Sequence, residues 1–259
     1  MSGPTVEYKS IERVAVLSMN RPDKFNCIST SLLADLAQGL EEAEADDNIR
    51  AVLLRANGPH FCTGADLDEV RSHSRTESAL HEFIGDGHAV MRRLEQSDLP
   101  VVAAIRGYCL AGGLELAMCA DVVIAADDVR LGCQHVRYGL VPGWGGTQRL
   151  PRLVGLRRAL DLMYSGRWLE AGEAFDWGLV NRVVDTAELE TRALAYASEL
   201  SSRNPEGIAA MKRLAREGLE RPLDEALARE QQVAVPALRS ENVAEGLRAF
   251  RERREPIFK

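Results

Sequence analysis

The sequence predicts an α/β fold with largely parallel strand pairing, followed by a helical C-terminal region. Short runs rich in Val, Ile and Leu, bounded by polar or Gly residues, are typical of buried strands. Longer segments with apolar residues at helical spacing lie between these runs, and this alternation favours an α/β protein. After about Leu150 helical patterns dominate, which predicts a change of architecture in the last third of the chain.

The individual elements follow in order along the chain. Strands are expected at residues 14–19, 51–56, 101–105 and 122–126, with one late strand at 180–184. The first helix should begin at Ser29-Thr30-Ser31, whose hydroxyls are candidate caps, and a second should occupy much of 76–96. Further helices are expected at 156–164, 170–177, 187–202, 205–220, 223–235 and 241–253. Pro205 and Pro222 stand where helices commonly start.

Bulk properties exclude several classes of protein. The 259 residues are enough for one large domain or one domain with a helical appendage. A net charge of −7 argues against nucleic acid as a partner, because binding to phosphates needs a basic surface. No run approaches the ~18 apolar residues that cross a bilayer, and the N-terminus lacks a charged-then-apolar leader. We therefore expect a cytoplasmic protein with no membrane partner.

The cysteines and histidines predict reduced thiols and no metal. No CxxC pair occurs among Cys27, Cys62, Cys109, Cys119 and Cys133. An odd number of cysteines at scattered spacings indicates buried thiols in a reducing compartment. The five histidines show no HExxH or Cys/His metal spacing.

Glycine-containing loops follow the strand-like runs at residues 57–67 and 107–116, and a third spans 139–148. In the second loop Ala111, Gly112 and Gly113 are small enough to let a ligand approach the backbone. A helix predicted at 114–119 would present free N–H groups there, which can stabilise negative charge on a thioester oxygen. Glu115, about one turn past Gly112, can face the same pocket. Alternatively, the glycines pack this helix tightly on the sheet and Glu115 is only an N-terminal charge.

Several motifs together resemble the crotonase, or enoyl-CoA hydratase/isomerase, superfamily. They are Asn20-Arg21-Pro22, the segment 61–67 with its Gly-Ala-Asp core, 107–121, Pro-Gly-Trp-Gly-Gly-Thr-Gln-Arg-Leu at 142–150, and the ending 250–258. The resemblance runs end to end. It implies a crotonase-like core, a right-handed spiral of ββα turns, over residues 1–195 and a helical trimerisation region over 196–259. It further implies a homotrimer or a dimer of trimers.

The resemblance also implies a site for an acyl-CoA substrate. The thioester of coenzyme A would be the substrate, with no tightly bound cofactor, and the backbone N–H groups of Ala65 and Gly112 would form an oxyanion hole. The implied substrate- and CoA-binding residues are Lys24, Cys62, Gly64, Asp66, Leu67, Tyr108, Leu110, Gly113, Gln134, Tyr138, Phe250 and Lys259. Phe250 and Lys259 would act at their own or a neighbouring subunit's site. The basic residues near them form either a solvated helix face or a docking site for cofactor phosphates.

One position departs from the pattern of the hydratases, which use two glutamates twenty positions apart. Glu115 matches the first glutamate, whereas His135 stands at the second. Either the imidazole, with an ordinary pKa of about 6.5, replaces the carboxylate in proton transfer, or His135 only fills the pocket. Tyr138 is either a spare hydroxyl or a packing aromatic. We predict an enoyl-CoA hydratase with Glu115 and His135 as catalytic pair; the alternatives are an isomerase, hydrolase, decarboxylase or non-catalytic acyl-CoA-binding protein.

Overall fold

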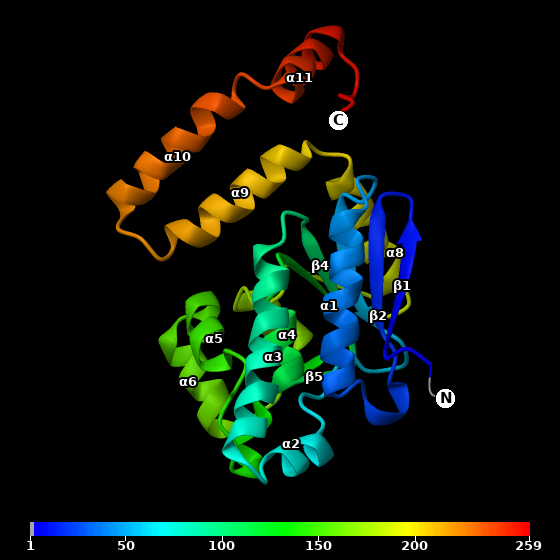
Figure 1. Ribbon diagram of the computed structural model, residues 1–259, viewed down its shortest axis with the longest axis vertical. Coiled ribbons are helices and arrows are strands. Elements are labelled where there is room, and N and C mark those ends of the chain that lie inside the picture. The colour runs from blue at the N-terminus through cyan, green and yellow to red at the C-terminus, as the bar shows by residue number, and fades with distance from the viewer. Residues whose placement is uncertain (1–2) are drawn as a thin grey trace.

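The computed structural model describes residues 3–259 and has a twisted, mostly parallel sheet at its centre (Figure 1). The strand order is β1 (Val6–Ile11), β2 (Val14–Met19), β3 (Ala51–Ala56), β4 (Val101–Ile105), β6 (Val122–Ala126) and β9 (Arg182–Val184). Within this sheet β1 and β2 pair antiparallel, and the other neighbouring strands pair parallel. The strands β2, β3, β4 and β6 have the predicted bounds. The late strand is shorter than predicted and begins at Arg182.

Helices cover both faces of this sheet. On one face lie α1 (Thr30–Ala45) and α3 (Glu77–Gln96), whose first turns are capped by the hydroxyls of Ser29 and Thr76. On the other face α8 (Leu189–Ser201) packs against the alternate side chains of the same strands. Residues 195 and 196, between which we predicted a boundary, both lie inside α8, and this helix packs with the core.

A second, three-stranded sheet stands beside the first. It consists of β5 (Tyr108–Leu110), β7 (Arg130–Gly132) and β8 (Leu169–Glu170). The short helices are α2 (Leu67–His73), α4 (Gly112–Ala117), α5 (Gly146–Val154), α6 (Leu156–Ser165) and α7 (Ala171–Asp176), with 3-10 turns η1 (Pro22–Lys24) and η2 (Gln134–Tyr138). The start of α4 precedes the predicted residue 114, so Gly112 itself is in the first turn.

The C-terminal helices α9 (Pro205–Gly218), α10 (Leu223–Ala237) and α11 (Glu241–Glu252) extend away from the sheet (Figure 1). Two side chains of α9 tie it to the core, since Lys212 Nζ and Arg216 Nη2 lie 2.7 and 2.8 Å from the carboxylate of Asp121. By contrast, α10 buries none of its residues. Within residues 3–259, no helix is both long and apolar enough to span a membrane.

Candidate active site

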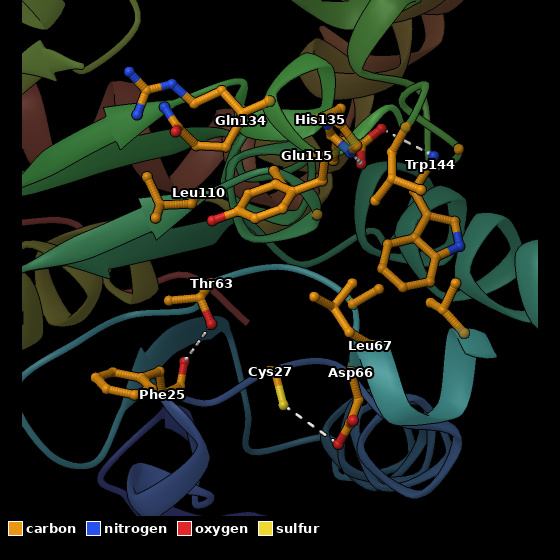
Figure 2. A pocket seen from close by; sticks show the side chains of 18 of the residues that line it. Phe25, Cys27, Thr63, Asp66, Leu67, Leu110, Glu115, Gln134, His135 and Trp144 are labelled. Atoms are coloured by element: carbon orange, nitrogen blue, oxygen red, sulfur yellow. Dashed lines mark hydrogen bonds and ion pairs between the residues drawn. The ribbon is translucent and has the colours of Figure 1, made fainter. Parts of the chain in front are cut away.

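A cavity of about 680 Å³ opens where the loops after β3 and β4 meet α3, η2 and the start of α5. It brings together many of the predicted site residues: Lys24, Ala65, Asp66, Leu67, Tyr108, Leu110, Gly112, Glu115, Gln134, His135 and Tyr138. Figure 2 shows Glu115 and His135 side by side on one wall, with Cys27 and Asp66 opposite. Residues far apart in the chain thus meet at one hollow.

The carboxylate of Glu115 is almost completely buried, with 2 % of the residue exposed. Its Oε1 accepts hydrogen bonds from the backbone N–H groups of Trp144, at 2.9 Å, and Gly146, at 2.7 Å. These two donors replace the water that the carboxylate loses on burial. The second oxygen, Oε2, is directed towards His135.

His135 Nε2 lies 3.5 Å from Glu115 Oε2, and its Nδ1 lies 3.4 Å from the sulfur of Cys133. Burial disfavours the charged imidazolium, but the hydrogen bonds to Cys133 and Glu115 and the charge of Glu115 outweigh it. Together they raise the pKa of His135 to about 9. The imidazole of His135 is therefore held in its cationic form at neutral pH, next to the Glu115 carboxylate.

Two backbone donors lie on the cavity wall near this pair. In the described part of the chain, the N–H groups of Ala65 and Gly112 have no hydrogen-bond acceptor. Ala111 precedes α4 with φ 48°, a left-handed conformation that a side chain rarely adopts and that bends the chain into the helix. Gly64 brings its loop close, since a Cβ there would lie 3.0 Å from the nitrogen of Gly112. The two N–H groups are thus free to bind a ligand.

Five predicted contact residues do not line the cavity. Cys62, Gly64 and Gly113 pack the first glycine loop against α4, and a Cβ at Gly113 would overlap the carbonyl oxygen of Cys62. Phe250 and Lys259 are also absent from it. Phe250 is 83 % exposed on α11, at the far end of the molecule from α2 (Figure 1), and Lys259 Nζ pairs with Glu241 at 2.9 Å.

Much of the apolar lining comes from residues outside the predicted contact set. Phe83 and Ile84 of α3 line the cavity. The indole of Trp144 fills the space between two helices, because a Cβ at Gly87 or Gly112 would overlap its ring. Within the described residues its Nε1 is the one buried side-chain N or O atom without a partner. The sequence does contain a signal for this position, because Trp144 interrupts the run of glycines at 143–146.

An aromatic row lines the mouth of the cavity. Tyr108 stacks on His60, with ring centroids 4.2 Å apart, and is flanked by Phe25 and Trp168. Phe25 also lines the cavity and is half exposed. Over residues 3–259, no cluster of three or more His, Cys, Asp or Glu side chains has the arrangement of a metal site.

The fold and this cavity define an α/β protein with a buried carboxylate–imidazole pair that faces a cavity beside two free backbone N–H groups. The enoyl-CoA hydratase/isomerase family model matches residues 9–259. The chain is 35 % identical to the short-chain-enoyl-CoA hydratase of Clostridium acetobutylicum, over 94 % of this chain and 93 % of that protein. It is 38 % identical to an enoyl-CoA isomerase/hydratase of Mycosarcoma maydis, over 93 % and 91 % of the two chains.

A solved structure agrees with these relatives. An enoyl-CoA hydratase from Bacillus anthracis superposes with a TM-score of 0.94 and 35 % identity, covering 98 % of this chain and 99 % of that one. The chain belongs to the enoyl-CoA hydratase/isomerase family. The predicted family and fold class, a crotonase-like α/β core with a helical C-terminal region, are confirmed.

Proposed function

We propose that the protein adds water across the double bond of a 2-enoyl-CoA thioester, with Glu115 as base and His135 as acid. The observation that carries this proposal is the Glu115–His135 pair, 3.5 Å apart, buried and facing the cavity beside two free N–H groups. The names of the relatives, which include short-chain-enoyl-CoA and crotonyl-CoA hydratases, support it.

The reaction begins at the thioester carbonyl. Its oxygen accepts hydrogen bonds from the N–H groups of Ala65 and Gly112, which makes the β-carbon electrophilic. Each such donor stabilises the developing oxyanion by roughly 2.7–4 kcal/mol in known examples. The remaining lining residues named above hold the acyl group and pantetheine.

Proton transfer follows from the charges of the pair. Glu115 removes a proton from water while the water oxygen bonds to the β-carbon, and the negative charge moves to the thioester oxygen. The His135 imidazolium then donates its proton to the α-carbon as the carbonyl re-forms. A proton passing from Glu115 to His135 across their 3.5 Å contact restores the starting state.

An enoyl-CoA isomerase is the second candidate. Moving a double bond needs one group that shuttles a proton between carbons, and Glu115 is the one member of the hydratases' glutamate pair that is retained. The name of the Mycosarcoma maydis relative includes both activities.

We also propose a homotrimer or dimer of trimers in the cytoplasm, held together by residues 196–259. Exposed apolar side chains on α9–α11 and on the residues that follow each of these helices support the assembly: Met211, Leu219, Leu223, Leu227, Val235, Leu238, Leu247, Phe250 and Ile257. In this assembly, Phe250 and Lys259 would reach a neighbouring subunit's cavity, where Lys24 would meet the coenzyme A phosphates.

The five cysteines, all free and buried, suit a reducing compartment.

The test follows the absorbance of the conjugated thioester of crotonyl-CoA. We expect the wild type to hydrate it, and Glu115→Ala and His135→Ala each to lower kcat by about 10²–10⁴. His88→Ala, an exposed histidine on α3, is the matched control and should retain full activity. A wild type that is inert while His135→Glu hydrates would overturn the proposal, and isomerisation of a 3-enoyl-CoA would then be measured.

A further inference from the structure

A buried ion pair lies directly behind the cavity wall. Glu95, at the end of α3, is 5 % exposed, and Arg149 of α5 contacts both of its oxygens. Arg149 Nε donates to Oε1 at 2.6 Å and Nη2 to Oε2 at 3.0 Å, which is the fork geometry of a strong pair. Neither residue lines the cavity.

The same guanidinium makes a third contact, which leads to Glu115. Arg149 Nη1 donates to the carbonyl oxygen of Trp144 at 2.6 Å. The turn from Trp144 to Gly146 is therefore held on both sides. Its carbonyl bonds outward to Arg149, and its two N–H groups bond inward to Glu115 Oε1.

The turn lies directly against the guanidinium, with no room for a side chain between them. Gly145 has φ 97°, which glycine adopts without strain, and a Cβ there would overlap Arg149 Nη1. Glu95 is itself surrounded by cations, because Arg92 lies 2.9 Å and Arg216 of α9 lies 3.6 Å from its oxygens. The chain of contacts thus runs from α9 and α3 through Arg149 to the turn.

We propose that the Glu95–Arg149 pair positions the catalytic carboxylate. By fixing the Trp144–Gly146 turn, it fixes Oε1 of Glu115 and so directs Oε2 at His135 and the cavity. The inference rests on the proposed function, in which Glu115 is the base. A buried pair adds little to stability compared with apolar residues of similar size, so an orienting role accounts for it better than a stabilising one.

The test compares Arg149→Met and Arg149→Lys with wild type in crotonyl-CoA hydration. In Arg149→Met the turn loses its anchor, and we expect kcat to fall by about 10²-fold while KM changes far less. The pH–rate profile should also differ from that of the wild type, because the turn no longer holds the carboxylate in one position. Arg149→Lys, which keeps the charge without the fork, should recover part of the rate.

Removing one partner leaves a buried charge, so Arg149→Met will also lower the melting temperature. The double variant Glu95→Gln/Arg149→Met separates the two effects. We expect it to regain melting temperature but not kcat or the wild-type pH profile. Recovery of all three, or a wild-type kcat and profile in Arg149→Met, overturns the inference.

Two controls complete the design. Arg55→Gln breaks a pair with Glu190 of α8, on the opposite face of the sheet, and should lower the melting temperature without changing the pH profile. Glu115→Ala identifies failure of the underlying proposal. If that variant keeps wild-type turnover, the proposed function is wrong, whereas a dead Glu115→Ala beside a fully active Arg149→Met rejects the positioning role alone.

Discussion

The position of His135 determines where the proton resides before the reaction starts. If position 135 carried a glutamate, its carboxylate and that of Glu115 would repel each other, and one of them would have to hold a proton. A carboxylate and an imidazole instead attract, and burial strengthens the attraction because few water molecules screen it. In the proposed hydration, Glu115 is then the base while His135 holds the proton that the α-carbon requires. The imidazole thus keeps one proton donor beside one proton acceptor, although the net charge of the pair differs from that of two glutamates.

The pH dependence tests this charge pattern. Burial opposes protonation, but Cys133 and Glu115 raise the pKa of His135 to about 9, so activity should fall on the basic side with a limb near pH 9. Because this pKa lies above the ordinary value of about 6.5, the pair's contribution to the free energy of unfolding is complete below about pH 6.5. It is lost as the pH rises through about 9.

Rate profiles and denaturant unfolding from pH 6 to 10, for wild type and His135→Gln, check both expectations. The variant should lack the basic limb and show a flatter dependence of stability on pH. A wild-type limb near pH 6.5 would mean that the imidazole is neutral during the reaction.

At the scale of a single element, α3 shows how a helix serves both the core and the site. Gly85 and Gly87 lie two residues apart on it, yet their surroundings differ. A Cβ at Gly85 would meet nothing within 4 Å, whereas one at Gly87 would overlap the indole of Trp144. The backbone of Trp144 in turn holds Glu115. The helix surface at Gly87 therefore determines where the turn before α5 can lie.

The two glycines form a matched pair for mutation. Gly85→Ala should raise the free energy of unfolding by roughly 0.5–1 kcal/mol, since alanine loses less backbone entropy in a helix. Gly87→Ala should lower it by about 1–3 kcal/mol, because the indole must move. It should also reduce kcat, whereas Gly85→Ala leaves kcat unchanged. Urea unfolding and the crotonyl-CoA assay measure both; equal effects of the two variants would contradict the packing described.

At the scale of the whole molecule, the C-terminal helices lack a partner within the chain. The leucines of α10 are exposed, and its contacts with the rest of the chain are made mainly through α9. An apolar surface of this kind marks a protein–protein contact. The proposed trimer supplies that contact and brings α11 of one subunit towards the next.

Light scattering should therefore give a mass of three or six chains, and the melting temperature should rise with protein concentration. Leu238→Glu, which places a charge on the exposed surface beyond α10, should shift the mass towards the monomer and weaken binding of coenzyme A. Gln231→Glu adds the same charge at a polar position of α10 and should do neither. A monomeric wild type at micromolar concentration would contradict the assembly.

The sequence alone predicts strands β2, β3, β4 and β6, the start of α1, the glycine loops and the family. Each of these is encoded locally: an apolar run bounded by polar residues specifies a buried strand, and a serine before a helical pattern specifies its start. The motif order also placed Ala65, Gly112, Glu115 and His135 at one site before any distance was known.

How these groups act on one another depends on the tertiary structure. The strands β5, β7 and β8 are two or three residues long, too short to show any periodicity. The donors to Glu115 lie 29 and 31 residues away, and Glu95 lies 54 residues from Arg149. Hydrogen bonds and pKa shifts depend on distances of a few ångströms between segments that are remote in the chain. Folding sets those distances, and no local pattern in the sequence records them.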